Sequence, residues 1–260
     1  MSIGLSSPLR YYGQLLKERL HLRPPAGRAD GLSELTNYPS NHKYRVGKGG
    51  ILPSFQLYTR MRKITPLYGD DMDSLLDIGC CRGAYVLSAA RRPACRRAVG
   101  VDVAEPFIQT AEAVRTRLGI QTVRFLPIPL EECVARVAEL GGPFHTVLML
   151  GMYHYLFWGG SKQKTGYLDH GKILSLVDSL CSHQVIFAAR LEVSACPTFI
   201  RKRAAGMGES VVYTTESFLA AARQRFDVTE AGKMEKGRLL LVLRSRRGKS
   251  APARGPVAGT

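Results

Sequence analysis

The chain has 260 residues, of which 45% are hydrophobic and 22% are charged. That length and composition suffice for one sizeable core with terminal additions. Lys and Arg number 37 against 21 Asp and Glu, so the formal net charge is +16, and a nucleic-acid partner is one expectation. No apolar run reaches roughly 18 residues and no signal-peptide pattern is present, so we predict no membrane span and a cytoplasmic protein.

The six cysteines indicate neither a metal site nor a disulfide framework. No C-x-x-C pair occurs, and most of the cysteines lie inside apolar segments. Zinc sites and disulfide-rich domains both need cysteines at recognisable spacings. We therefore predict reduced thiols in the core and no bound metal.

Residues 1–68 are predicted to form an extension in front of the main domain. A short helix is expected near 11–20, and the Pro- and Gly-containing stretch 23–28 interrupts regular structure. Apolar residues at helical spacing over 51–64 predict a helix that packs on the core or forms a lid. The glycine-rich stretch 47–50 lacks the G-x-x-x-x-G-K-S/T spacing of a phosphate loop, so we interpret it as a flexible hinge.

From Ser74 onward, apolar strand patterns alternate with helical patterns, which is typical of a doubly wound α/β sheet covered on both faces. The pattern predicts strands near 74–79, 97–102, 121–126, 144–150 and 184–190, and helices near 84–92, 104–118, 130–140 and 171–182. A helix near 215–225 and a hairpin of strands near 226–231 and 237–243 close the domain. Residues 246–260 are basic and without periodicity, so we predict a disordered tail.

A glycine turn follows the first strand of this pattern. Asp77, Gly79 and Gly83 form a D-x-G-x-x-x-G sequence, and a helical segment begins directly after it. Glycine adopts positive φ and allows a ligand close to the backbone. Asp102 ends the next apolar run, where a carboxylate can accept hydrogen bonds from ribose hydroxyls. Together these features predict a nucleoside-containing cofactor.

The turn resembles motif I of the class I S-adenosylmethionine-dependent methyltransferases, D-x-G-x-G-x-G, with Cys81 in place of the middle glycine. The G-x-G-x-x-G spacing of dinucleotide folds fits less well. The resemblance implies a mostly parallel seven-stranded sheet with an antiparallel last strand over residues 69–245, and S-adenosyl-L-methionine as cofactor. It also implies these cofactor-binding residues: Asp77, Gly79, Cys80, Cys81, Gly83, Asp102, Val103, Ile128 (through its backbone), Leu150 and Gly151.

The same resemblance places Tyr153 and His154 beside the transferred methyl group, because they follow the fourth strand of the sheet. His154 is the candidate general base, since an imidazole accepts protons near neutral pH, and Tyr153 would stack on or orient the acceptor. Structural roles at a strand end are the alternative for both residues. Two loops, 158–170 and 192–208, are expected to flank the acceptor with a positive rim made of Lys162, Lys164, Arg201, Lys202 and Arg203.

Three functions remain open on the sequence alone. The first is a methyltransferase acting on a nucleic acid, such as tRNA, which the net charge favours. The second is a methyltransferase for a small acidic or hydroxylated metabolite, which shares the core and differs in its pocket loops. The third is a noncatalytic nucleotide- or RNA-binding protein that retains the fold.

Overall fold

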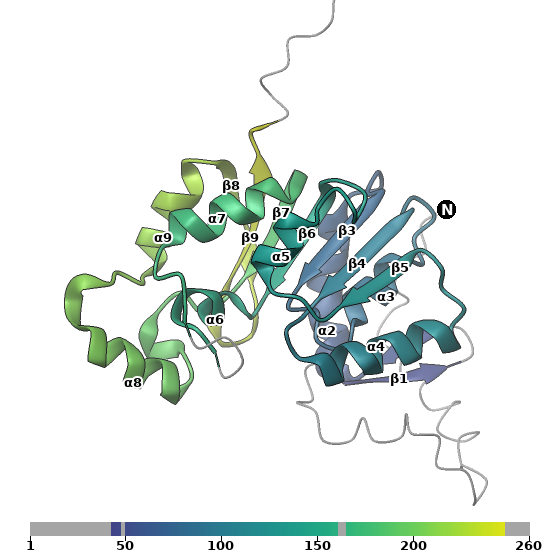
Figure 1. Cartoon of the computed structure of the whole chain (residues 1–260), viewed down its shortest axis with the longest axis horizontal. Helices are drawn as coiled ribbons and strands as arrows, with labels where there is room; N and C mark the ends of the chain where they lie inside the picture. The colour runs from purple at the N-terminus through teal and green to yellow at the C-terminus, as the bar shows by residue number, and fades with distance from the viewer. Residues whose placement is uncertain (1–42, 48–49, 161–164, 248–260) are drawn as a thin grey trace, which may run out of the picture.

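Two sheets organise the part of the chain that the computed structural model describes, residues 43–47, 50–160 and 165–247 (Figure 1). The larger sheet has seven strands in the order β5-β4-β3-β6-β7-β9-β8. Its strands are β3 (Ser74–Ile78), β4 (Arg97–Val101), β5 (Val123–Leu126), β6 (Phe144–Leu150), β7 (Cys181–Ala188), β8 (Phe226–Lys233) and β9 (Leu239–Ser245).

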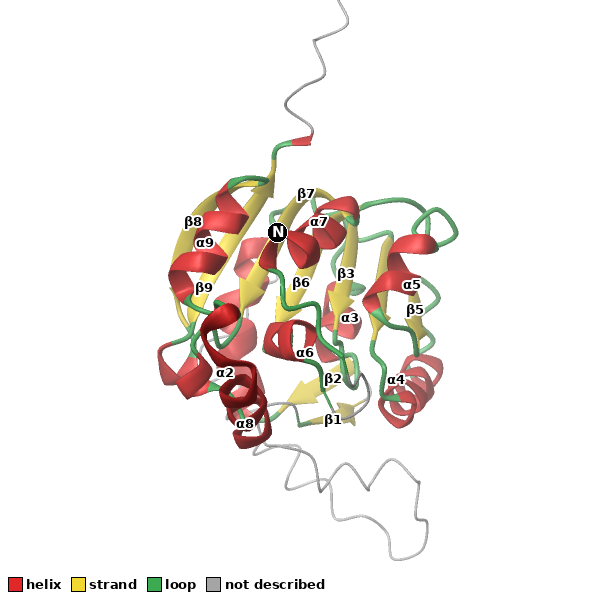
Figure 2. Ribbon diagram, turned by 60° about the vertical axis from the view of Figure 1, so that its left-hand side comes forward, coloured by secondary structure: helices red, strands yellow, loops and turns green. Residues whose placement is uncertain are grey.

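Strand direction confirms the predicted sheet. Strands β5, β4, β3, β6 and β7 pair in parallel, whereas β9 pairs antiparallel with both β7 and β8. Figure 2 shows β5 and the β8–β9 hairpin at opposite edges of this sheet. The parallel strands are mostly apolar, and β3 and β4 are almost wholly buried, because helices cover both faces.

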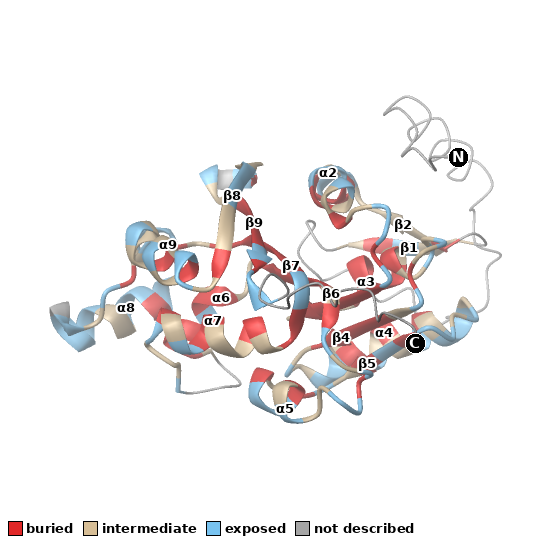
Figure 3. Cartoon of the chain, turned by 90° about the horizontal axis from the view of Figure 1, so that it is seen from above, coloured by how far each residue is buried: buried red, intermediate tan, exposed pale blue. Residues whose placement is uncertain are grey.

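Helices pack on the two faces through separate apolar clusters. On one face lie α2 (Phe55–Ile64), α3 (Ala84–Ala89) and α4 (Glu105–Arg117). On the other lie α5 (Leu130–Ala135), α7 (His170–Ser179) and α9 (Thr215–Arg223). The buried strands run between these layers in Figure 3. The remaining helices are α6 (Tyr153–Trp158), α8 (Thr198–Met207), η3 (Thr65–Tyr68), η4 (Val193–Ala195), η5 (Gly208–Ser210) and η6 (Glu235–Gly237).

The predicted helix over 51–64 is wrong in its first part. Residues 50–53 form β2 (Gly50–Pro53), which pairs antiparallel with β1 (Tyr44–Gly47), so Gly47 and Gly50, the two ends of the glycine-rich stretch, are paired strand residues. Helix α2 begins only at Phe55, after the Ser54 side chain accepts the N–H of Leu57, because Pro53 and the Ser54 cap separate the two elements. The Tyr44 hydroxyl donates to the carbonyl of Arg82 over 2.6 Å, which attaches the hairpin to the glycine turn.

The second segment that was expected to flank the acceptor is also more regular than predicted. Residues 192–208 contain η4 and α8 rather than a loop, and α8 buries only Ile200. A helix with so small an apolar face leaves little periodic signal. Helix α6, which follows β6, was likewise not predicted as a helix. The expected helix near 11–20, Lys162, Lys164 and residues 248–260 lie outside the described residues.

No helix among the described residues is both long enough and apolar enough to cross a membrane.

Candidate functional site

The parallel strands end at one edge of the sheet, and this edge gathers the predicted site residues. Gly79 follows β3, Asp102 follows β4, Gly151 follows β6 and Arg190 lies just beyond β7. Open α/β sheets bind ligands outside the carboxyl ends of their strands. Gly79 and Gly151 are close neighbours, because a Cβ built on Gly79 would lie 2.8 Å from the Met152 side chain.

Backbone geometry explains the glycines of the turn between β3 and α3. Gly79 has φ 74° and Gly83 has φ 75°, a region that side chains with a Cβ rarely adopt. The N–H groups of Gly79 and Cys80 both donate to the carbonyl of Val101, over 2.8 and 3.0 Å, so β4 holds the turn in place. A Cβ on Gly83 would lie 2.3 Å from the Phe125 ring, so Gly83 also allows close packing of β5 against α3.

The two cysteines of the turn differ in what they do. Cys80 is buried, and its sulfur occupies the space beside Gly100, where an added Cβ would lie 2.8 Å away. Cys81 is one of two described non-glycine residues with positive φ, at 54°. The position where motif I carries its middle glycine therefore has, in this chain, a left-handed backbone that suits glycine.

Asp102 connects the glycine turn to the start of α4. Its Oδ2 accepts the N–H of Cys81 and its Oδ1 accepts the N–H of Ala104, each over 2.9 Å. A carboxylate has about four lone-pair directions, so both oxygens can still accept from a diol. Val103, the next residue, has 42% of its surface exposed, and it presents an apolar surface beside the carboxylate.

Asp77, at the end of β3, is a buried carboxylate without a donor. It is 3% exposed, and within the described part of the chain no hydrogen bond reaches its side chain. Burial and then the Asp102 carboxylate raise the pKa of Asp77, whereas Arg60 lowers it. A positively charged ligand group at this position would satisfy the acceptor that the protein leaves open.

Three further predicted cofactor residues offer a ligand mainly their backbone. Leu150 is 7% exposed and Ile128 is 6% exposed, so a ligand would meet mainly their backbone. Gly151 has φ 80°, and its N–H donates to the carbonyl of Ala188 over 2.6 Å. The end of β6 is thereby fixed against β7.

Tyr153 lies inside an aromatic cluster rather than at the surface of the site. It has no exposed surface, and its hydroxyl lies 2.6 Å from Nδ1 of His170, whose Nε2 lies 3.1 Å from Oγ of Ser217. Phe187 and Phe218 pack edge-on against its ring. The chain of hydrogen bonds joins α6, α7 and α9. This geometry favours a positioning role for Tyr153, and the predicted contact with the acceptor stays a prediction.

His154 is also fully buried, beside two arginines. Its Nε2 accepts a long hydrogen bond of 3.4 Å from Nη1 of Arg190, so the neutral ring carries its proton on Nδ1. Burial, then Arg190 and Arg238, lower its pKa from 6.5 to about 3. An imidazole with that pKa is a weak base at neutral pH. The role of general base therefore stays a prediction, and the geometry favours positioning.

Arginines at this edge are the feature that sequence reasoning missed. Arg60 from α2 and Arg238 before β9 share Glu235, with N to O distances of 3.8 and 2.8 Å. A Cβ on Gly151 would lie 3.5 Å from Nη1 of Arg238. These residues are far apart in sequence and belong to no motif, so only the fold brings them together. Of the predicted positive rim, Arg201, Lys202 and Arg203 lie on α8, where Arg203 donates to the carbonyl of Trp158.

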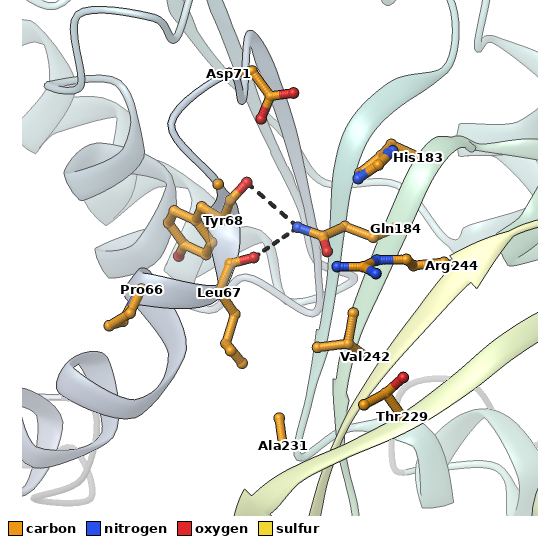
Figure 4. Close-up of a pocket in the computed structure, with 11 residues that line it drawn as sticks. Pro66, Leu67, Tyr68, Asp71, His183, Gln184, Thr229, Ala231, Val242 and Arg244 are labelled. Atoms are coloured by element: carbon orange, nitrogen blue, oxygen red, sulfur yellow. Dashed lines mark hydrogen bonds between the residues drawn. The ribbon is translucent and has the colours of Figure 1, made fainter.

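A cavity of about 450 Å³ lies elsewhere, between η3 and the face formed by β7, β9 and β8 (Figure 4). The amide of Gln184 crosses one side of it and donates to the carbonyls of Leu67 and Tyr68, over 2.7 and 3.4 Å. Asp71 and His183 line it near the amino end of β7. It contains none of the predicted site residues. Among the described residues, no group of three His, Cys, Asp or Glu side chains could hold a metal ion.

No protein-family model matches this sequence, and no curated protein sequence matches it. Solved structures do match its fold. The N-terminal domain of EvdMO1 with S-adenosylhomocysteine (SAH) bound has a TM-score of 0.57 and 16% identity, covering 83% of this chain and 94% of that domain. The bifunctional kinase-methyltransferase WbdD has a TM-score of 0.53 and 19% identity, covering 72% of this chain and 39% of WbdD.

This is the fold of S-adenosylmethionine-dependent methyltransferases. The match to the longer EvdMO1 chain has a TM-score of 0.55 and 17% identity, covering 83% of this chain and 46% of that one. The chain thus spans less than half the length of the longer EvdMO1 and WbdD chains. Within the methyltransferase fold, the glycine turn and Asp102 lie at the carboxyl edge, as the resemblance to motif I implies.

Proposed function

We propose that this protein is an S-adenosylmethionine-dependent methyltransferase whose site lies at the carboxyl edge of the large sheet. The observation that carries the proposal is the joined pair of a left-handed glycine turn after β3 and a carboxylate after β4, linked by the hydrogen bond from Cys81 to Asp102. The EvdMO1 domain of similar fold is described with SAH bound, which supports the same cofactor class here.

The residues present fit the two ends of this cofactor. Asp102 would accept hydrogen bonds from the ribose hydroxyls, next to the apolar surface of Val103. The open carboxylate of Asp77, with Arg60 near it, suits the ammonium and carboxylate of the methionine part. Bound S-adenosylmethionine supplies an electrophilic methyl group on a sulfonium sulfur. The chain's own task is then to align an acceptor with it and to exclude water.

The acceptor end of the site would begin at Gly151 and continue toward α6 and α8. Gly151 precedes Met152 and lies close to Nη1 of Arg238. His154 follows in the first turn of α6. Because His154 is neutral and enclosed, we assign it and Tyr153 to holding this end of the sheet in shape. An acceptor whose nucleophile ionises readily would need no stronger base.

RNA is the second acceptor class that we weigh. The net charge of +16 would draw a polyanion to the surface at a salt-dependent rate. The charge counts the whole chain, however, and says nothing about which atoms reach the site. RNA methylation is therefore the alternative proposal for the acceptor, to be compared with small acids in the same assay.

Calorimetric titration of the purified chain with SAH, with NAD in parallel, tests the cofactor class. We expect micromolar binding of SAH and no binding of NAD. Asp102→Asn should weaken SAH binding at least tenfold, as expected for a lost charged hydrogen bond. Glu105→Gln, an exposed carboxylate three residues further along, serves as the matched control and should leave it unchanged. Failure of SAH to bind would overturn the proposal.

Turnover is tested separately, by transfer of a labelled methyl group from S-adenosylmethionine to total tRNA and to a set of small organic acids. Label in either fraction supports catalysis and names the acceptor class. SAH binding combined with no transfer to any of these acceptors would favour a noncatalytic protein on the same fold.

A further inference from the structure

Two arginines lie just beyond the end of the ladder that joins β7 to β9. The ladder ends at the pair of Ala188 and Leu240, and Arg190 and Arg238 each lie two residues beyond it. Like charges held close together repel each other. Burial and then Arg60 lower the pKa of Arg238, as does Arg190, whereas Glu235 raises it.

The protein supplies few negative charges here. Glu235 pairs with Arg238 over 2.8 Å and also lies 3.8 Å from Arg60. Within the described residues, no carboxylate lies within ion-pair distance of Arg190, and its guanidinium makes one hydrogen bond, to the neutral His154. A half-buried guanidinium without an anion is costly. An anionic ligand group would balance it.

The position of Arg190 in the sheet separates it from the residues proposed to bind the cofactor. The glycine turn and Asp102 follow β3 and β4, whereas Arg190 follows β7, two strands away from β3, which is roughly 10 Å at the usual strand spacing. Gly151 lies between them, and Arg238 reaches back to it. Arg190 and Arg238 therefore lie on the acceptor side of the proposed methyl-transfer site.

An exposed aromatic pair borders the same place. The rings of Tyr155 on α6 and Phe199 on α8 stack with centroids 6.1 Å apart and an interplanar angle of 12°. They are 37% and 44% exposed. The Tyr155 ring lies 4.2 Å from the ring of His154, which itself contacts Arg190. A flat apolar surface thus adjoins the positive charge.

We propose that the methyl acceptor is a small organic molecule with a flat apolar body and one anionic group, which Arg190 and Arg238 bind. This inference rests on the proposed function and narrows its substrate class. The anionic group is a carboxylate or a phosphate. Arg238 is only 12% exposed, so a small molecule reaches it more readily than a phosphate in an RNA backbone.

The test uses the full chain saturated with SAH and three anions: benzoate, acetate and inorganic phosphate. Saturation-transfer NMR measures which of them bind. We expect benzoate to bind more tightly than acetate, because it adds the apolar body. Arg190→Gln should weaken benzoate about tenfold or more and leave SAH affinity within about twofold. Arg223→Gln, an exposed arginine at the end of α9, removes the same charge and should change neither.

Each result is decisive for one of the two proposals. If SAH binds but none of the anions does, or if Arg190→Gln and Arg238→Gln both leave anion binding unchanged with a native circular dichroism spectrum, the inference is overturned and the proposed function stands. Tighter phosphate than benzoate binding, lost in Arg190→Gln, assigns a phosphorylated acceptor. Competition by a short RNA that depends on Arg190 overturns the small-molecule acceptor. If SAH does not bind, the proposed function is refuted. Binding of benzoate to the SAH-free chain that depends on Arg190 would still support the anion site.

Discussion

The backbone N–H of Cys81 donates to Oδ2 of Asp102 over 2.9 Å, and this hydrogen bond joins the turn after β3 to the end of β4. Oδ1 of the same carboxylate accepts the N–H of Ala104. Asp102 therefore has a structural role in addition to its proposed contact with ribose. Experiments on this residue have to separate stability from ligand affinity.

Asp102→Asn should lower both the stability of the fold and the affinity for SAH, for different reasons. One of the two backbone N–H groups loses its charged acceptor, so we expect a loss of about 1–2 kcal/mol in the free energy of unfolding. Urea denaturation measures that loss. SAH affinity should fall by more than the fraction unfolded explains, since the ligand hydroxyls lose the charge too. A fall in stability with unchanged affinity would leave Asp102 a purely structural residue.

Gly83→Ala should be strongly destabilising. The added Cβ would lie 2.3 Å from the Phe125 ring, at a φ of 75°, so strain in the backbone adds to a clash between side chains. We expect a loss of about 2–4 kcal/mol by urea denaturation. Gly119→Ala is the matched control, with φ 64° and no atom within 4 Å of the new Cβ. It should cost about 1 kcal/mol. Equal effects would show that packing against Phe125 does not matter.

Substitutions of Cys81 test whether the left-handed backbone or the thiol matters. Cys81→Gly should keep SAH affinity within about twofold, because glycine adopts φ 54° without strain and the lost side-chain packing is small. Cys81→Val should destabilise the fold by about 1–3 kcal/mol, since a β-branched residue is strained there. Urea denaturation and calorimetry report the two effects. A glycine variant that no longer binds SAH would assign a direct role to the thiol.

Tyr153→Phe removes the hydroxyl that lies 2.6 Å from His170 and leaves the buried imidazole without that partner. We expect a loss of about 1–3 kcal/mol in stability and an unchanged SAH affinity. Chemical denaturation followed by calorimetry at a temperature where the variant is folded checks both. If stability is unchanged but methyl transfer falls, Tyr153 contacts the acceptor after all.

Stability should decrease as the pH falls below about 6.5, the ordinary pKa of histidine. Burial is the largest cause that lowers the pKa of His154 to about 3, and Arg190 and Arg238 add to it. Burial also lowers the pKa of His170 to about 4, against the opposing effect of Asp169. At pH values between those pKa values and 6.5, these histidines bind protons in the unfolded chain but stay neutral in the folded protein. The free energy of unfolding therefore rises with pH in this window, by up to about 1.4 kcal/mol per pH unit for each histidine.

His154→Gln checks this assignment by removing one of the two groups. Its stability, measured by urea denaturation at several pH values between 4.5 and 7, should depend less steeply on pH than that of the unchanged protein. His183→Gln, at an exposed position on β7, is the comparison. Burial and then His145 lower the pKa of His183 too, so this variant should alter the slope, but less than His154→Gln. If stability depends on pH equally steeply in the unchanged protein and in the His154→Gln variant, His154 does not remain neutral in the folded state.

The fold was predictable because its signals are local. The apolar runs of β3, β4 and β6 need only neighbouring residues to be recognised, and parallel strands covered on both faces follow from them. The turn from Asp77 to Gly83 is equally local, since positive φ at Gly79 and Gly83 is a requirement of a few consecutive residues. The elements that the sequence did not predict are short ones with little apolar periodicity, such as β1, β2 and α8.

The sequence by itself therefore determined the sheet, the glycine turn and the carboxylate after β4. Only the tertiary structure decided that Tyr153 and His154 are enclosed and that Arg190, just beyond β7, and Arg238, just before β9, come together at one edge of the sheet. Burial and the meeting of residues from different elements depend on how strands β6, β7 and β9 align. No local pattern records that alignment, because each side chain's environment is made by residues distant in the chain.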